Sequence, residues 1–123
     1  MATMELLGAP LTLTDAKDVR RVRQEICRRA AESLPKLDRL DDIELLASEA
    51  VTNAVLHGTA PVDVAVIAGP DRIRVEVRDQ GPASPASDRR DHGRGLTIIE
   101  AVASRWSLQP DVYGTCLWFE VDL

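Results

Sequence analysis

Glu49 and Asn53 are four residues apart in a segment whose small apolar residues recur at helical spacing. Four residues is close to one helical turn, so both side chains should face the same side of the helix, beside its apolar stripe. There, Glu49 could accept a proton from an attacking hydroxyl, and the side-chain oxygen of Asn53 is a ligand type that suits Mg²⁺. The alternative is that both side chains are simply solvated on the shoulder of the helix.

Asp79 ends a segment, starting at Arg72, in which apolar and charged residues alternate strictly. Strand periodicity places its carboxylate on the same face as the apolar side chains, which is the face turned to the core. A carboxylate there is costly unless a donor binds it. The donor could be the amino group of a ligand such as adenine, with Gly81 leaving room for a flat ring. Alternatively, Asp79 only ends the strand and caps the following turn.

Gly93, Arg94 and Gly95 come directly before a helical apolar pattern that begins at Leu96. Free N–H groups at the start of a helix bind phosphate well, and glycines allow close approach to the backbone. The same short motif also fits an ordinary junction between a loop and a helix. By itself, this segment therefore allows a phosphate site without requiring one.

The order of these motifs resembles that of the GHKL (Bergerat-fold) ATPases, a superfamily that includes the sensor histidine kinases. The short chain and the closing Trp118-Phe119-Glu120 look most like its anti-sigma-factor serine kinase branch. The resemblance covers the chain from about Thr14 onward. The motifs that carry it are, in chain order, Glu49-Ala-Val-Thr-Asn53-Ala54, Asp79-Gln-Gly81, Gly93-Arg-Gly95-Leu96 and Gly114-Thr115.

The resemblance implies a role for each matching residue. Asn53 would hold Mg²⁺ and Glu49 would be the general base. Asp79 would accept the adenine amino group, with Gly81 beside the base and Thr115 supporting the contact. The residues implied around the phosphates are Gly93, Arg94, Gly95 and Leu96. Strand alternation agrees for Thr115, since it places this residue on the inward face of the last strand.

The segment from about 80 to 94 would be the ATP lid, and it departs from the family pattern. Ala83 stands where a second glycine is usual, and Cys116 follows Thr115 where a threonine is common. The segment contains no lysine, so arginines would have to supply positive charge to the phosphates. Phosphoryl transfer depends on positioning and charge neutralisation, so such changes could silence turnover while ATP binding survives.

One domain over residues 1–123 is expected to position these residues. Helical and strand patterns together predict an α/β (α+β) two-layer sandwich, in which a mixed, mostly antiparallel sheet packs against three helices. The apolar run at 62–68 is typical of a strand covered on both faces. The predicted elements are an edge strand within 4–13, a helix from 14 to about 34, a helix capped by Asp38 and ended by Gly58, strands at 62–68 and 72–79, a helix over 96–103, and a strand over 113–123.

Composition limits the classes of function. The chain of 123 residues has 45% hydrophobic residues and a formal net charge of −5, which fits a packed domain and argues against binding to nucleic acid. Its two cysteines, Cys27 and Cys116, are expected to be reduced thiols. No apolar run is long enough to cross a bilayer. We therefore expect a cytoplasmic protein without membrane contact.

Three functions remain open. The resemblance favours an Mg-ATP-dependent serine kinase that binds a sigma factor and phosphorylates an anti-anti-sigma (STAS-domain) partner, with a homodimer as its expected assembly. Ala83 and the altered lid favour an ATP-gated interaction module without catalysis. In the third alternative, the domain binds no nucleotide and Asp79 only caps a turn.

Overall fold

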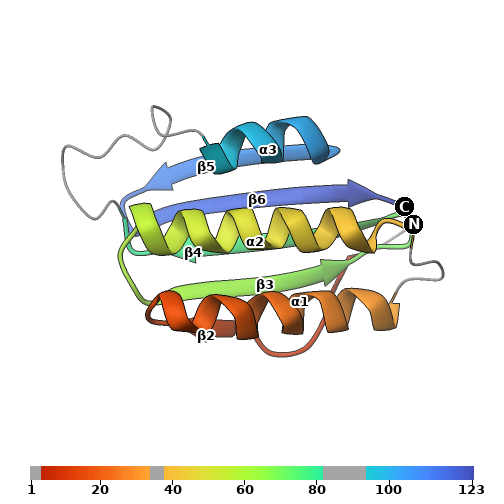
Figure 1. Ribbon diagram of the computed structural model, residues 1–123, viewed down its shortest axis with the longest axis horizontal. Coiled ribbons are helices and arrows are strands. Elements are labelled where there is room, and N and C mark those ends of the chain that lie inside the picture. Colours follow the sequence, from red (N-terminus) through yellow and green to blue (C-terminus); the bar gives the residue numbers. More distant parts are fainter. Residues whose placement is uncertain (1–3, 34–37, 82–93) are drawn as a thin grey trace.

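The computed structural model describes residues 4–33, 38–81 and 94–123. The described part of the chain has three α-helices and one sheet, and Figure 1 shows the helices lying against the sheet in an α+β arrangement. The elements are β1 (Glu5–Leu6), β2 (Leu11–Leu13), the 3₁₀ helix η1 (Ala16–Asp18), α1 (Val19–Ser33), α2 (Leu40–His57), β3 (Val62–Ala68), β4 (Arg72–Asp79), α3 (Arg94–Val102), β5 (Arg105–Asp111) and β6 (Gly114–Asp122).

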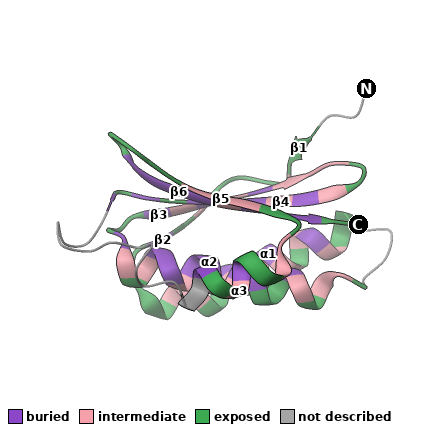
Figure 2. Cartoon of the chain, turned by 90° about the horizontal axis from the view of Figure 1, so that it is seen from above, coloured by how far each residue is buried: buried purple, intermediate pink, exposed green. Residues whose placement is uncertain are grey.

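The sheet has the strand order β1-β3-β4-β6-β5, and β2 also pairs with β3. All three helices cover the same face, and within the described residues no helix lies over the other face of the sheet (Figure 2). The predicted two-layer sandwich is therefore confirmed. The sheet was expected to be mixed, whereas every strand pair within the described part of the chain is antiparallel.

Alternation along β4 builds the centre of the core. Ile73, Val75 and Val77 are completely buried under the helices, as their period of two predicted. β3 alternates in the same way, with buried and half-buried residues in turn. The prediction that β3 is covered on both faces is therefore wrong. Its second face carries small or aliphatic residues, such as Ala65 and Ile67, but none of the helices that the structure describes covers them.

Some of the helix ends have the capping hydrogen bonds that the sequence predicts, and one does not. Asp15 Oδ1 accepts a hydrogen bond of 3.0 Å from the backbone N–H of Lys17 and so caps η1. Gly58 ends α2, and its N–H donates to the carbonyl of Ala54 at 2.9 Å. The prediction that Asp38 caps α2 is wrong, because Arg39 occupies the cap position without a side-chain cap bond. The acidic residues of the first turn still complement the helix dipole.

β5 was not predicted from the sequence. It pairs along its length with β6, from Arg105 opposite Glu120 to Asp111 opposite Gly114. Its pattern was present but short, since only Trp106 and Leu108 alternate with polar residues. A proline lies near its end, which is tolerated because β5 is an edge strand.

Glu120 connects three strands on the open face of the sheet. Its carboxylate accepts hydrogen bonds from Arg72 at 3.2 Å, Arg74 at 3.0 Å and Arg105 at 2.8 Å. The Arg74 guanidinium also lies 3.9 Å from the centre of the Trp118 ring. Burial alone would raise the pKa of Glu120, but these three hydrogen bonds outweigh it and hold the pKa below its ordinary value. The charge is therefore a structural tie between β4, β5 and β6.

Within the described ranges, none of the helices combines the length and the apolar character needed to cross a bilayer.

Candidate nucleotide site

The predicted site residues that the structure describes belong to elements that meet at one end of the sheet. The end of β4, the start of β6, the start of α3 and the end of α2 all lie there (Figure 1). Antiparallel pairing places Asp79 directly opposite Thr115. α2, which carries Glu49 and Asn53, packs on β4 and β6. The fold thus brings residues from distant parts of the sequence to one edge of the two layers.

Asp79 is fully buried, as strand alternation predicted. Its Oδ1 accepts a hydrogen bond of 2.8 Å from the backbone N–H of Gly81. The simpler interpretation, in which the Asp79 carboxylate caps the turn, is therefore confirmed. It does not exclude a ligand, because the two oxygens of a carboxylate offer about four acceptor positions.

Gly114 brings the backbones of β4 and β6 unusually close together beside Asp79. A Cβ atom on Gly114 would lie 2.0 Å from the carbonyl oxygen of Asp79, and the residue has φ of +142°. Only glycine fits both the space and the conformation. Gly81, also buried, has φ of +117°. The sequence places Gly114 next to Thr115, but this contact follows from the strand register and could not be read from the sequence.

Thr115 is 5% exposed and lies on the core face with the apolar residues of β6, as predicted. Cys116 lies on the opposite face, across from Arg78. Burial raises the pKa of the Cys116 thiol, which keeps it protonated at neutral pH. The departure from the family pattern at this position therefore lies on the other side of the sheet from Asp79 and Thr115.

Asn53 presents a buried polar atom that needs an explanation. The residue is 4% exposed, and its Oδ1 has no hydrogen-bond partner within the part of the chain that the structure describes. Leaving a buried acceptor unsatisfied costs about 1–3 kcal/mol, so native structures rarely do so without a ligand, water or ion nearby. An unpaired amide oxygen fits a hard cation such as Mg²⁺, which binds oxygen ligands.

Glu49 lies one turn before Asn53 on α2 and is half-buried. This position allows its carboxylate to act on a group bound near Asn53. The described residues contain no cluster of three or more His, Cys, Asp or Glu that could hold a metal ion. A cation at Asn53 would therefore take most of its ligands from phosphate oxygens and water, as Mg²⁺ does in nucleotide sites.

The phosphate side of the site is only partly described. α3 begins at Arg94, so the backbone of Arg94 and Gly95 forms the first turn of a helix. Leu96 is buried against the core. Gly93, and the predicted lid from residue 82 onward, lie outside the described residues. The lid and the phosphate contacts thus stay predictions.

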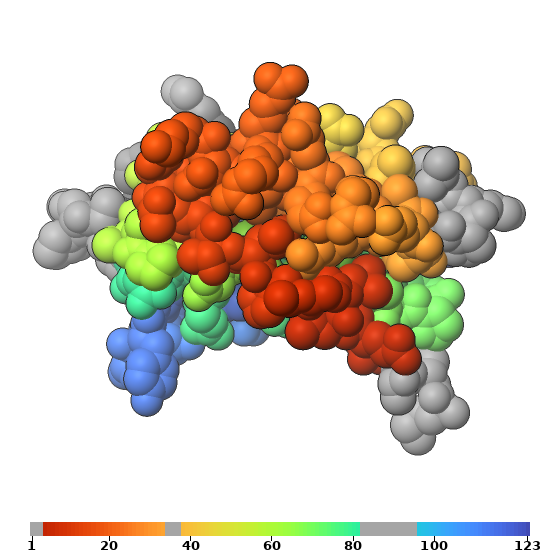
Figure 3. All heavy atoms as spheres, turned by 90° about the horizontal axis from the view of Figure 1, so that it is seen from below, coloured from red at the N-terminus to blue at the C-terminus, as the bar shows by residue number. Residues whose placement is uncertain are grey.

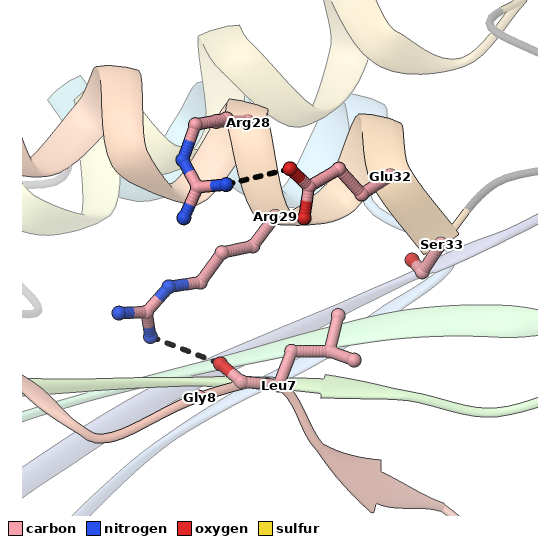
Figure 4. A pocket seen from close by; sticks show the side chains of 6 residues that line it. All are labelled: Leu7, Gly8, Arg28, Arg29, Glu32 and Ser33. Carbon is pink, nitrogen blue, oxygen red and sulfur yellow. Dashed lines mark hydrogen bonds and ion pairs between the residues drawn. The ribbon is translucent and has the colours of Figure 1, made fainter.

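A pocket of about 320 Å³ lies elsewhere, between α1 and the N-terminal segment. Arg28 pairs with Glu32 there at 2.6 Å, and Arg29 donates to the carbonyl of Leu7 at 2.9 Å (Figure 4). Gly8 packs against the Arg29 guanidinium. Arg29 therefore attaches the N-terminal segment to α1, whereas the Arg28–Glu32 pair lies within α1 itself.

One known protein family matches most of the chain. Residues 10–121 match the family model of the histidine kinase-like ATPase domain. The chain belongs to this family. The GHKL resemblance seen in the sequence is thereby confirmed, and an ATPase domain implies a nucleotide-binding site.

Two proteins that are similar to this histidine kinase-like ATPase domain indicate which members of the family it resembles. An anti-sigma F factor of Clostridium acetobutylicum is 33% identical over 88 residues, which cover 58% of this chain and 62% of that protein. The crystal structure of the RsbU and RsbW domains of Rv1364c from Mycobacterium tuberculosis matches with a TM-score of 0.70 and 27% identity. That match covers 93% of this chain and 32% of the other. This chain therefore corresponds to less than two thirds of either protein.

Proposed function

We propose that this domain binds ATP at the edge formed by Asp79, Thr115 and Asn53, and that it acts as an anti-sigma regulator with serine kinase activity. The observation that carries the proposal is the buried Oδ1 of Asn53, which has no protein partner among the described residues. The family match supports nucleotide binding. The similarity to an anti-sigma F factor supports a sigma factor as one partner.

Adenine would be recognised from β4 and β6. The Asp79 carboxylate would accept a hydrogen bond from the adenine amino group while still accepting the one from Gly81. Thr115, directly opposite, would support this contact. Gly81 carries no side chain, so a flat ring could lie against its backbone.

Phosphoryl transfer would take place beside α2. Asn53 would hold Mg²⁺, and a bound ion would supply charge neutralisation at the phosphates. Glu49 would accept the proton of the attacking serine hydroxyl. The first turn of α3, which begins at Arg94, would offer its N–H groups to the phosphates. Gly93 is proposed to contact the phosphates as well, as the family resemblance implies.

The acceptor would be a serine of an anti-anti-sigma (STAS-domain) protein, as the family resemblance implies. The same resemblance suggests a homodimer and a cytoplasmic location. Both are part of this proposal.

A second candidate is an ATP-gated interaction module without catalysis, favoured by Ala83 in the lid segment. Cys116 gives this alternative little support, because its side chain lies on the face away from Asp79. Glu49→Ala separates the two candidates. Under the kinase proposal it should retain ATP affinity and lose phosphotransfer by about 10²–10⁴-fold, the range that general-base catalysis contributes. Transfer of radiolabelled phosphate to purified STAS proteins measures this, and unchanged transfer would remove Glu49 from the catalytic role.

The primary test is calorimetric titration of ATP into the protein with and without Mg²⁺, alongside Asn53→Ala. We expect Mg²⁺ to tighten ATP binding in the unaltered protein and to have little effect in the variant. ATP at 100 times its Kd should also raise the free energy of unfolding by about 2.7 kcal/mol. If millimolar ATP neither binds nor stabilises the protein, the nucleotide proposal is wrong and a purely protein-binding domain remains.

A further inference from the structure

The turn between β5 and β6 presents two apolar side chains to solvent. Val112 is 91% exposed and Tyr113 is 79% exposed, more than any other large apolar side chain in the described ranges. The hairpin that carries them projects from the body of the molecule (Figure 3, blue). Single exposed apolar residues are common on protein surfaces, but two adjacent ones at a projecting tip form a small hydrophobic contact point.

Folding of the turn does not account for these two residues. Short hairpin turns favour Asn, Asp and Gly, and positive φ angles occur here only at the glycine that follows the turn, Gly114. Val112 and Tyr113 bury little of their surface and so gain little from the hydrophobic effect. Tyrosine is, however, enriched among the residues that contribute most to protein–protein binding.

The turn is held in a fixed conformation. Asp111 Oδ1 accepts a hydrogen bond of 2.7 Å from the N–H of Tyr113, and Asp111 Oδ2 pairs with Arg78 at 3.1 Å. The hydrogen bond from Tyr113 and the ion pair with Arg78 keep the pKa of Asp111 below its ordinary value, so the carboxylate stays charged at neutral pH. A turn that is already ordered loses less conformational entropy when it binds a partner.

The turn is also fixed relative to the nucleotide site. Gly114, the first residue of β6, lies against the carbonyl of Asp79. Arg78, which pairs with Asp111 of the turn, directly precedes Asp79 in the sequence. The tip thus lies at the same end of the sheet as the end of α2 and the start of α3 (Figure 1). A protein whose serine reaches a phosphate at that end has to lie against this end of the domain.

We propose that the Val112–Tyr113 tip is a docking element for the phosphoacceptor protein, with the ring of Tyr113 entering an apolar pocket on that protein. This inference rests on the proposed function, because it assigns the acceptor as the occupant. A sigma factor bound at the tip in place of the acceptor is an alternative outcome that the same test detects and that contradicts the proposal.

The test uses the unaltered protein, a Val112→Ser/Tyr113→Ser variant and a Tyr113→Phe variant. Purified STAS-domain proteins and sigma factors encoded in the same genome serve as probes, with Mg-ATP present. We expect the double serine variant to weaken binding of the STAS acceptor by about tenfold or more, the size of a hot-spot loss. Tyr113→Phe, which keeps the ring, should retain most of the affinity. ATP affinity should be unchanged in both variants, because neither side chain belongs to the nucleotide site.

Leu6→Ser is the matched control. Leu6 is 55% exposed but lies in β1, which pairs with the last residues of β3 at the end of the sheet away from the site, so its loss should leave acceptor binding unchanged. Equal acceptor affinity in the parent and the double serine variant would overturn the docking proposal, as would a parent protein that binds no STAS protein. Acceptor binding without phosphotransfer would count against the kinase activity alone, and the docking proposal would still be judged by binding.

Discussion

Two buried acids on opposite faces of the same sheet show how surroundings decide what a carboxylate does. Glu120, 6% exposed on the open face, is held by three guanidinium groups from β4 and β5. Asp79, fully buried on the helix-covered face, accepts a hydrogen bond from a backbone N–H in the turn after its strand. The first arrangement joins strands together. The second keeps a carboxylate at the edge of the two layers, where we propose that the nucleotide binds.

The largest effect on the difference between the two acids is expected at Gly114, because this residue allows β6 to lie close to the backbone of Asp79. Gly114→Ala would place a methyl group 2.0 Å from the Asp79 carbonyl oxygen, where the clash is with backbone. We expect a loss of about 3 kcal/mol or more in the free energy of unfolding, together with loss of ATP binding. Urea denaturation and calorimetry measure the two effects.

Gly69→Ala is the control for that substitution. Its added methyl group would meet the sulfur of Met4, the end of a flexible and partly exposed side chain that can move aside. The stability of this variant should stay within about 1 kcal/mol of the parent. An equal loss at both glycines would show that the close backbone contact at Gly114 has no special role.

Asp79→Asn is expected to affect ATP binding rather than folding. The amide keeps an oxygen that can accept the Gly81 hydrogen bond, but it removes the charge and adds a donor that opposes the adenine amino group. We expect ATP affinity to fall by about 100-fold with a small change in stability. Normal ATP affinity in this variant would remove Asp79 from the site.

Glu120→Gln should show the opposite pattern. It leaves three arginines without their shared anion, and we expect a loss of about 2 kcal/mol in stability with unchanged ATP affinity. Asp122→Asn is the matched control. Asp122 lies on the same strand as Glu120 and also pairs with Arg105 of β5, but it is half exposed, so its loss should change stability by less than about 1 kcal/mol. Weaker ATP binding in Glu120→Gln would contradict the separation of the two faces.

The smallest effect concerns pH. The folded-state pKa of Glu120 lies below its ordinary value of 4.5. The stability that this charge contributes is therefore fully present above pH 4.5 and is lost as the pH falls through the lower, folded-state pKa. Thermal unfolding across this acidic range should be less steep in pH for Glu120→Gln than for the parent. Parallel curves would mean that other carboxyl groups cause the acid sensitivity.

Sequence patterns could predict the parts of this fold that depend on neighbours along one strand or helix. The alternation in β4 and β6 gave the correct faces for Asp79 and Thr115. The apolar spacing of α2 also placed Glu49 and Asn53 on one helix. These are consequences of the two backbone periods, 2.0 and 3.6 residues.

Features that depend on distant residues could not be predicted in this way. The Gly114 contact with Asp79 requires the register between β4 and β6. The three arginines around Glu120 come from β4 and β5, and β5 itself gave too short a pattern to be recognised. The wrong prediction of a cap at Asp38 has the same cause. Arg39 occupies the cap position instead, where it pairs with Asp42 at 2.9 Å and donates to the carbonyl of Asp122, a residue distant in sequence, at 3.0 Å.

α2 runs from Leu40 to His57 as one unbroken helix, with Ile43 buried in the core near one end and Asn53 near the other. At a rise of about 1.5 Å per residue, roughly 15 Å separates these two positions along its axis. Because the helix is unbroken, a change in its position where it packs on the middle of the sheet also moves the side-chain oxygen of Asn53. Enlarging or shrinking a core side chain such as Leu46 would thus displace Asn53 more than one turn away. If Asn53 holds Mg²⁺ as proposed, packing far from the nucleotide would set how accurately that ion is placed.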